Sequence, residues 1–357
     1  MNTATLAALG WGEPFESAFA PYAGRDLEPA RIGVEHRNRH LVHAADAEVD
    51  ARLSGKLKQH LEQTGDRPVV GDWIALHREP DGTGTIQARL PRKSQFSRKV
   101  AGRAIEEQVM AANIDVAFLA TALTADLNPR RIERYLLMTW ESGAQPVILL
   151  TKADLMEDRA PALEEVGRVA KDVPTHLISG RTGEGLDQLD PYLTPGTTVA
   201  VLGSSGVGKS TLINRLLGSE HLRTGEVRDD GRGRHTTTYR ELVRLPSGAL
   251  MIDTPGLREL QLWESDAGLQ EAFSEIEALA AQCRFGNCVH QTEPGCAVRS
   301  ALAAGTLSAE RLESYRRLSR ELQHIEEKND ARARAEREKA ARSANQLLRK
   351  RLKEKGQ

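Results

Sequence analysis

Hydrophobic and polar residues follow two different patterns along the first two-thirds of the chain. Between residues 31 and 97, short strand-like runs (RIGVEH, HLVHAA, VVGDWIAL and GTIQARL) are separated by turn signals such as Asp81-Gly82-Thr83-Gly84. Several short strands in so short a stretch predict a small β-barrel, with the OB-fold as the leading candidate. Residues 1–30 mix Gly, Pro and polar side chains, and this mixture predicts a partly ordered lead-in.

The pattern changes after about Asn113. Apolar runs (IDVAFLATAL, PVILLT, THLIS, TVAVLG and ALMID) alternate with helical stretches, which is typical of a parallel α/β sheet. This part is expected to span residues 98–262. The last part, residues 263–357, is mostly helical and is interrupted by a cluster of cysteines. The fold class is therefore multidomain: an OB-fold barrel, an α/β domain and a helical C-terminal domain.

Composition narrows the cellular setting. A length of 357 residues predicts two or three domains, and a hydrophobic content of 39% supports folded cores. No apolar run approaches the ~20 residues of a membrane span, and the N-terminus lacks the features of a secretory signal, so we expect a cytoplasmic protein without a membrane partner. The three cysteines all lie between Cys283 and Cys296, which argues against a disulfide framework and for a metal site.

A phosphate-binding loop is the strongest single motif. Residues 203–210, GSSGVGKS, match the pattern G-x-x-x-x-G-K-[ST] between a strand-like run and a helical run. Backbone N–H groups of such a loop point at phosphate oxygens, while Lys209 contacts the β- and γ-phosphates and the Ser210 hydroxyl ligates Mg²⁺. A chance glycine-rich turn is the alternative. The residues expected to bind GTP here are Gly203, Ser204, Ser205, Gly206, Val207, Gly208, Lys209, Ser210 and Thr211.

Two further segments resemble the switches of a GTPase. Asp253-Thr254-Pro255-Gly256 follows an apolar strand, so that Asp253 can hold Mg²⁺ and the Gly256 N–H can reach the γ-phosphate. Between the phosphate loop and this motif lies GRGRHTTT, in which one of the three threonines is expected to reach Mg²⁺ and the γ-phosphate. The alternative for this segment is a mobile linker. Its candidate residues are His235, Thr236, Thr237 and Thr238.

A guanine-recognition motif precedes the phosphate loop by some fifty residues. In TKAD, Asp154 is expected to accept hydrogen bonds from the guanine N1–H and N2 amino group, and Lys152 to pack along the base. Thr151 replaces the usual Asn, and Ser179-Gly180-Arg181-Thr182-Gly183 after the next strand fits the loop whose backbone contacts the guanine oxygen. The expected base-binding residues are Thr151, Lys152, Ala153, Asp154, Ser179 and Gly180. This chain order predicts a circularly permuted GTPase domain.

The cysteine cluster has the spacing of a structural zinc site. Its pattern is C-x4-C-x-H-x5-C, and three thiolates with one imidazole fill a tetrahedral shell without an open position. Free buried cysteines near an unrelated His are the alternative. The expected ligands are Cys283, Cys288, His290 and Cys296.

Two segments are strongly basic. Residues 328–357 hold eleven Lys or Arg against four Asp or Glu, and residues 89–103 hold six Lys or Arg and no acidic residue. A solvated helix face explains either segment alone. Two basic segments together with a candidate OB-fold favour a polyanionic partner, most simply RNA.

Together these motifs resemble the RsgA (YjeQ/EngC) family of circularly permuted GTPases. The resemblance covers nearly the whole chain and includes VGDW at 70–73, EQV at 107–109, ANID at 112–115 and GRHTTT at 233–238. It implies an OB-fold, a permuted GTPase domain and a C-terminal zinc domain. It further implies late maturation of the small (30S) ribosomal subunit, hydrolysis of GTP that the subunit stimulates, 16S rRNA and other small-subunit assembly factors as partners, and a protein that we expect to be a monomer.

One departure concerns catalysis. Leu257 stands after Asp253-Thr254-Pro255-Gly256, where many GTPases carry a Gln that orients the attacking water. We therefore expect a slow intrinsic rate, with His235 as one candidate for the missing group. Two other functions stay open at this point: a GTP-gated RNA-binding switch in which hydrolysis is incidental, and a nucleic-acid ATPase, against which Asp154 argues.

Overall fold

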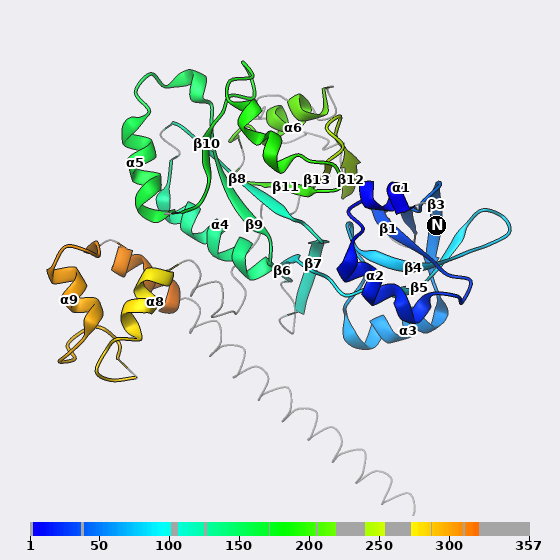
Figure 1. The fold of residues 1–357 in the computed structure, drawn as a ribbon, viewed down its shortest axis with the longest axis horizontal. Coiled ribbons are helices and arrows are strands. Elements are labelled where there is room, and N and C mark those ends of the chain that lie inside the picture. The colour runs from blue at the N-terminus through cyan, green and yellow to red at the C-terminus, as the bar shows by residue number, and fades with distance from the viewer. Residues whose placement is uncertain are drawn as a thin grey trace, which may run out of the picture. The chain divides into compact units, whose positions relative to one another are not determined.

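The computed structural model describes most of the chain (Figure 1). The chain divides into two units: residues 1–98 with 108–261, and residues 99–107 with 262–357. The described residues are 3–36, 39–100, 106–124, 127–170, 172–204, 206–218, 240–253, 273–286, 288–309 and 311–320.

Five short strands form the barrel that the sequence predicts. They follow the order β1-β2-β3-β5-β4, and β4 returns to pair with β1, while β3 and β5 are parallel and the other neighbours antiparallel. A helix crosses from β3 to β4. These elements are β1 (Glu28–Glu35), β2 (His40–His43), β3 (Glu48–Leu53), α3 (Gly55–Thr64), β4 (Trp73–Arg78) and β5 (Gly84–Arg89). The arrangement is that of an OB-fold, which confirms this prediction.

The N-terminal residues pack against the barrel more tightly than their mixed polarity predicts. Leu6, Phe15 and Phe19 are buried in one cluster with Trp73 of β4, and the ring of Trp11 lies 4.7 Å from that of Trp73. Phe15 and Phe19 are four residues apart in α2 and share one helical face, which is the signal for this packing, while Trp11 precedes the helix. The elements are α1 (Thr3–Ala8), α2 (Glu13–Phe19) and the 3₁₀ turn η1 (Ala20–Tyr22).

The GTPase part is a sheet with helices on both faces. Its strand order is β10-β9-β8-β11-β13-β12, and only β12 runs antiparallel to its neighbour. Alternate residues of the strands pack against α4 and α5 on one face and against α6 and η3 on the other (Figure 1). The elements are β8 (Val116–Ala122), α4 (Pro129–Ser142), β9 (Gln145–Thr151), η2 (Ala153–Leu155), α5 (Ala160–Val169), β10 (Thr175–Leu177), η3 (Leu186–Tyr192), β11 (Thr198–Leu202), α6 (Lys209–Leu217), β12 (Glu241–Arg244) and β13 (Leu250–Asp253).

Barrel and GTPase sheet are joined into one sheet of eleven strands. β12 pairs with β1 at Glu241 and Val34, and beside this pair Arg240 donates to the Glu35 carboxylate at 3.1 Å. Deeper in the joint, the fully buried Arg31 donates to three backbone carbonyls, one of them that of Asn113 at 3.0 Å. Burial lowers the pKa of Arg31 to about 10, so it stays charged at neutral pH.

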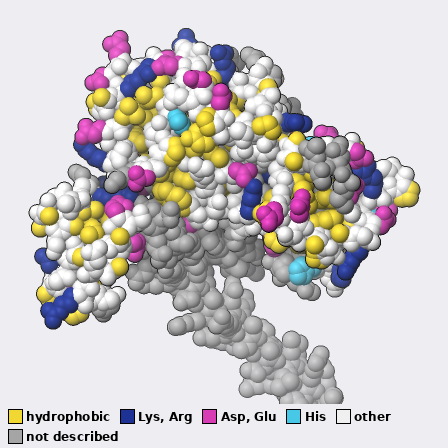
Figure 2. Space-filling model, in the orientation of Figure 1, with side chains coloured by type: hydrophobic (Ala, Val, Ile, Leu, Met, Phe, Trp, Pro, Cys, Tyr) yellow, Lys and Arg dark blue, Asp and Glu magenta, His cyan; other side chains and the backbone are white. Residues whose placement is uncertain are grey.

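The first half of the basic segment 89–103 is engaged within the protein. Arg89 and Arg92 both form ion pairs with Asp66. Arg92 also pairs with the buried Asp72, and Lys93 pairs with Asp115. A role in RNA binding stays a prediction for the later residues of this segment, since the side chains from 98 to 103 lie outside the description. Over the described surface in Figure 2, Lys and Arg are interspersed with Asp and Glu.

The remaining elements are short. β6 (Gln95–Val100) and β7 (Glu106–Ala112) form a two-stranded sheet, and the C-terminal unit contains α8 (Ser274–Ala280), α9 (Ala297–Ala303) and helical residues at 311–320. Phe273 is buried in this unit, where Arg311 lies over its ring at 4.1 Å. Among the described residues, every helix is too short or too polar to cross a membrane. The basic tail at 328–357 lies outside the description, and the predicted domain boundaries stay predictions.

Candidate nucleotide site and metal centre

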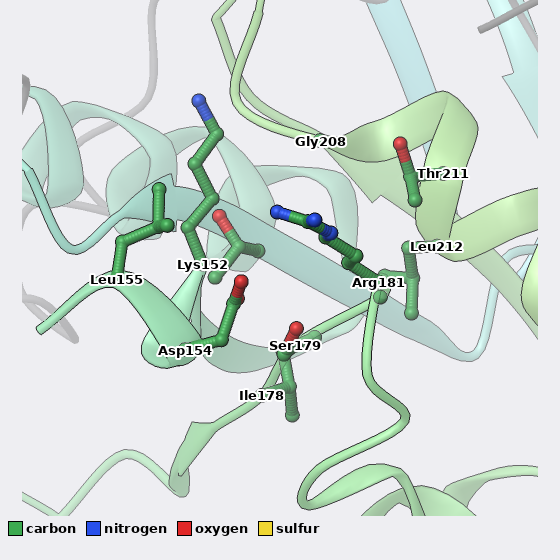
Figure 3. A pocket seen from close by; sticks show the side chains of 11 residues that line it. Lys152, Asp154, Leu155, Ile178, Ser179, Arg181, Gly208, Thr211 and Leu212 are labelled. Carbon is green, nitrogen blue, oxygen red and sulfur yellow. The ribbon is translucent and has the colours of Figure 1, made fainter.

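A pocket of about 290 Å³ lies where β9, β10 and the start of α6 meet (Figure 3). The predicted guanine motif and the helix end of the phosphate loop, some fifty residues apart in sequence, line it together. The lining residues are Thr151, Lys152, Asp154, Leu155, Ile178, Ser179, Gly180, Arg181, Gly208, Thr211 and Leu212. The circularly permuted chain order therefore still produces one site at the carboxyl edge of a parallel sheet.

The backbone around Asp154 is held in a fixed shape. Lys152 adopts a left-handed conformation (φ 60°), which is uncommon outside glycine and turns the chain sharply from β9 into η2. The N–H of the buried Ala153 then donates to the carbonyl of Ile178 at 3.1 Å, so the two loops predicted to recognise the base are tied together. Asp154 is thereby presented to the pocket by rigid neighbours.

The second loop is ordered by its own hydrogen bonds. Ser179 is fully buried, and its Oγ accepts from the N–H of Thr182 at 3.1 Å. Gly180 lies so close to α6 that an added Cβ would be 3.2 Å from the N atom of Leu212. The side chain of Arg181 extends into the pocket between Lys152 and Thr211 (Figure 3). The predicted loop at 179–183 contains Arg181, but its side chain was assigned no role from the sequence; Leu155, which directly follows TKAD, was likewise not predicted to line the site.

Thr151 connects the base-recognition motif to the phosphate loop. Its Oγ1 donates to the carbonyl of Val207 at 2.6 Å, and the carbonyl of Thr121 lies 3.3 Å away. The side chain is buried, so the bond is shielded from water. The hydroxyl at the position usually held by Asn thus fastens β9 to the loop.

We expect Thr151→Val to weaken nucleotide binding about tenfold, because it leaves the buried carbonyl of Val207 without a donor at an otherwise unchanged volume. Titration with a fluorescent GDP analogue measures the dissociation constant. Thr151→Ser is the matched control and should stay near the wild-type value, since it keeps the hydroxyl. Equal affinities of the Val and Ser variants would contradict this role.

The phosphate loop runs from the end of β11 to the start of α6. Gly203, Gly206 and Gly208 all have positive φ angles, and a Cβ on Gly203 would lie only 2.4 Å from the carbonyl oxygen of Ala120. The loop curls around the ammonium group of Lys209, which donates to the carbonyls of Gly203 (2.6 Å) and Ser204. These features explain why glycines and a lysine occupy these positions.

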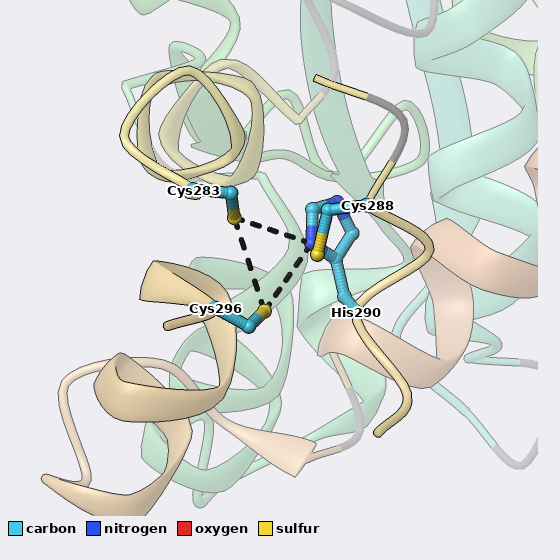
Figure 4. A group of neighbouring side chains, drawn as sticks. All are labelled: Cys283, Cys288, His290 and Cys296. Atoms are coloured by element: carbon cyan, nitrogen blue, oxygen red, sulfur yellow. Dashed lines mark hydrogen bonds between the residues drawn. The ribbon is translucent and has the colours of Figure 1, made fainter. Parts of the chain in front are cut away.

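The four predicted metal ligands converge in the C-terminal unit (Figure 4). The Nδ1 of His290 lies 3.6 Å from the Sγ of Cys283 and 3.4 Å from that of Cys296, and the two sulfurs are 3.8 Å apart. With Cys288, all four ligand atoms lie within 4.8 Å of one another. Bonds of ~2.3 Å to a tetrahedral Zn²⁺ place sulfurs roughly 3.8 Å apart, so these residues fit a zinc ion.

Glu293 organises the loop between the ligands. Its carboxylate accepts from the backbone N–H groups of Val289 (3.1 Å), Gln291 (2.8 Å) and Thr292 (3.0 Å). Hydrogen bonds from backbone N–H groups lower the pKa of Glu293 to about 2, and the largest contribution comes from the N–H of Glu293 itself. Next to it, the Sγ of Cys296 accepts from the N–H of Arg299 at the start of α9. Hydrogen bonds within the protein therefore hold the loop and at least one ligand sulfur in position.

Comparison with known proteins decides the family. The model of the RsgA GTPase family matches residues 89–263, and that of 50S ribosome-binding GTPases matches residues 198–329. The small ribosomal subunit biogenesis GTPase RsgA of Opitutus terrae is 47% identical over 94% of this chain and 95% of its own length. This chain belongs to the RsgA family. A relative of the same name from Lactiplantibacillus plantarum, numbered RsgA 2, is 50% identical over 82% of this chain and 83% of its own length.

Solved structures support the fold of this RsgA family member. The YjeQ structure from Thermotoga maritima has a TM-score of 0.66 at 24% identity and covers 83% of this chain and 99% of its own. YloQ, a circularly permuted GTPase, has a TM-score of 0.62 at 22% identity and covers 85% and 98%. The predicted family, the multidomain permuted fold and the activity of a GTP hydrolase are therefore confirmed.

Several predicted site residues of this RsgA protein lie outside the described residues. They are Ser205, His235, Thr236, Thr237, Thr238 and Gly256, together with the side chain of Asp253. The backbone of Asp253 ends β13, which runs parallel to β11, and so reaches the same sheet edge as the phosphate loop. Ser210, in the first turn of α6, lies at this edge too. The roles given to these residues stay predictions.

Proposed function

We propose that this GTPase acts in late maturation of the small ribosomal subunit, where it contacts 16S rRNA and hydrolyses GTP to GDP and phosphate. The observation that carries the proposal is its 47% identity, over 94% of the chain, to a relative named for small ribosomal subunit biogenesis. The pocket that joins the guanine motif to the phosphate loop supports it at the level of chemistry.

In this proposal, Asp154 accepts hydrogen bonds from the guanine N1–H and amino group. The stem of Lys152 packs along the base, while Ser179 and Gly180 contact its oxygen. N–H groups of residues 203–211 cradle the phosphates, to which Lys209 adds a full positive charge. Ser210 and Asp253 would hold the Mg²⁺ that accompanies GTP, and this ion would neutralise charge between the β- and γ-phosphates.

The Cys283, Cys288, His290 and Cys296 cluster is proposed to bind one structural Zn²⁺. Its four ligands would fill the tetrahedral shell and leave no position for a substrate, so the ion would serve the fold of the C-terminal unit. The acceptor bonds of Glu293, which hold the loop between the ligands, support this assignment.

Coupling between RNA and nucleotide is proposed to use two connections. In sequence, the predicted second switch at Gly256 leads directly into the C-terminal unit, so RNA bound there can act on the switch. The joint of barrel and GTPase sheet is the second connection. Arg240 stands two residues after Thr238, the last of the predicted switch threonines, and it pairs with Glu35 of the barrel strand β1. An RNA that binds the barrel and favours one arrangement of this joint would thereby bias the switch, and GTP would bias RNA binding equally.

Contacts to rRNA would be mainly to its backbone, and their affinity would fall as the salt concentration rises. Other assembly factors, a cytoplasmic location and a monomeric state belong to the same proposal.

We expect GTP hydrolysis by the protein alone to be slow and to rise about 10²-fold with 30S subunits, by analogy with activation in trans. The reason is that Leu257 cannot orient the attacking water, so the docked state completes the site. The measurement is the rate of phosphate release with 30S subunits, 50S subunits or free RNA added at equal concentrations.

A chain that ends at residue 262 serves as the comparison. It should still bind guanine nucleotides, because every residue of the pocket is retained. It should lose the stimulation, because the C-terminal unit that follows the predicted second switch at Gly256 has been removed. Equal rates with and without 30S subunits would contradict the proposal and would favour a GTP-gated switch in which hydrolysis is incidental. Full stimulation of the shortened chain would exclude a role of the C-terminal unit in it.

A further inference from the structure

An arginine outside every recognised GTPase motif contacts the phosphate loop. Arg131 is the third residue of α4, and its Nη1 donates to the Oγ of Ser204 at 3.0 Å. The helix is capped by Asn128, whose side chain accepts from the N–H of Arg131, so the first turn is firmly placed. A half-buried guanidinium is therefore fixed at the second residue of the loop.

The charge of this helix start is unusual. The first turn of α4 holds Arg130 and Arg131 and no acidic residue. Because a helix N-terminus already carries a partial positive charge, acidic residues stabilise this position and arginines destabilise it. Arg130 is exposed to solvent, whereas Arg131 is half-buried and directed at the loop. The side chain that this helix start directs at the loop is therefore a cation.

The contacts also show which end of the nucleotide Arg131 faces. Gly208 and Thr211, at the helix end of the loop, line the guanine pocket, so the strand end of the loop lies away from the base. At that end the ammonium of Lys209, the group that contacts β- and γ-phosphates in such loops, reaches the carbonyl of Ser204. Lys209 and Arg131 thus meet at the same residue from two sides.

We propose that Arg131 is a catalytic residue that binds the terminal phosphate group of GTP. The inference rests on the proposed nucleotide site and adds a cation from α4 to it. A guanidinium has five N–H donors, so Arg131 can keep its bond to Ser204 while it donates to a phosphate oxygen. It is always protonated and exchanges no proton in the reaction.

In the hydrolysis step, a water oxygen bonds to the γ-phosphorus as the bond from that phosphorus to the β–γ bridging oxygen breaks. The proton of the water leaves with the phosphate product or to solvent. Negative charge shifts among the phosphate oxygens during this step, and a fixed cation stabilises it. In this chain, where Leu257 takes the place of the usual Gln, Arg131 supplies part of the missing stabilisation from within the same molecule.

The test compares Arg131→Ala with Arg130→Ala in the full-length protein. For each variant, dissociation constants are measured for GDP and for a non-hydrolysable GTP analogue, and single-turnover hydrolysis is measured with saturating 30S subunits.

Arg131→Ala should lower the hydrolysis rate about 10- to 100-fold and weaken binding of the GTP analogue about tenfold, as expected for the loss of a hydrogen bond to a charged group. GDP affinity should change by less than about twofold, because GDP lacks the terminal phosphate. Arg130→Ala, exposed on the same turn, should match wild type in all three measurements.

Retained GDP binding shows at once that Arg131→Ala is folded, and Arg131→Lys, which keeps the charge without the planar fork, should recover part of the GTP-analogue affinity. A loss of equal size for GDP and the GTP analogue would overturn the inference in favour of a purely structural bond to Ser204. Lys209→Ala separates the two proposals: it should abolish binding of both nucleotides. If Lys209→Ala does so while Arg131→Ala behaves like Arg130→Ala, only the role of Arg131 is wrong. If Lys209→Ala binds both nucleotides normally, the proposed nucleotide site itself is wrong.

Discussion

Cys288→Ala is expected to remove the zinc ion and to unfold the segment between α8 and α9. A structural zinc contributes ~10–16 kcal/mol to the folding of small zinc peptides, which exceeds or matches the ~5–15 kcal/mol net stability of a typical domain. Apart from the metal, the loop that carries the ligands is supported by hydrogen bonds, among them those of backbone N–H groups to Glu293 and of Arg316 to the carbonyl of His290. Loss of one ligand should therefore leave the short helices α8 and α9 without their common anchor.

Elemental analysis of the wild-type protein should give one zinc per chain, and limited proteolysis of the variant should show new cleavage between residues 273 and 320. Val289→Ala is the matched control, because Val289 stands beside Cys288 and is 59% exposed. Nucleotide binding should persist in both variants, since the pocket is built by the other unit. A zinc-free wild-type protein from a reducing preparation, or a variant as resistant to protease as wild type, would contradict the zinc site.

Asp154→Asn is expected to weaken GTP binding by about 10²- to 10⁴-fold and to favour xanthosine triphosphate. The carboxylate is expected to accept two hydrogen bonds from guanine, and each bond to a charged group contributes ~1.5–3 kcal/mol. An Asn amide presents a donor where guanine also donates, whereas xanthine carries an oxygen there and can accept. Because Lys152 and Ala153 fix the backbone, Asn at this position cannot easily turn away from the base.

Competition of both triphosphates against a fluorescent guanine nucleotide measures the exchange of specificity. Glu157→Gln provides the control: it makes the same kind of change on an exposed side chain three residues away, outside the pocket, and should leave GTP affinity unaltered. Unchanged GTP affinity in Asp154→Asn would show that another residue recognises guanine.

Local spacing in the sequence was sufficient for those parts of the protein that depend on neighbouring residues. The pattern C-x4-C-x-H-x5-C predicted four ligands that do converge. The motif at 203–210 predicted a tight glycine-rich loop between a strand and a helix, and the structure has such a loop between β11 and α6. The permuted order became credible because two base-recognition elements each followed an apolar strand, and the structure places both beside the phosphate loop.

Contacts that depend on distant residues were not predictable. Arg131 and Ser204 are far apart in sequence, and no spacing rule connects them. The hydrogen bond from Thr151 to the carbonyl of Val207 likewise forms only in the assembled sheet. From the sequence alone, Thr151 was visible only as a replacement for the usual Asn. Arg89 and Arg92 seemed free to bind RNA until the fold brought Asp66 and Asp72 to them. The ion-pair partner of a charged residue cannot be identified from the sequence when only the tertiary structure brings the two side chains together.

The pairing of β1 with β12 has a consequence for biosynthesis. All five barrel strands are complete once residue 89 has been made, whereas Glu241, which pairs with Val34, follows about 150 residues later. Domains fold as units during synthesis, N-terminal parts first, and the entropy of closing a loop grows only slowly with its length. The barrel is therefore expected to close early on the nascent chain and to present the edge of β1 as a template. The GTPase sheet can dock on this edge only after β12 has left the translating ribosome, so the joint between barrel and GTPase sheet would form late in the synthesis of each molecule.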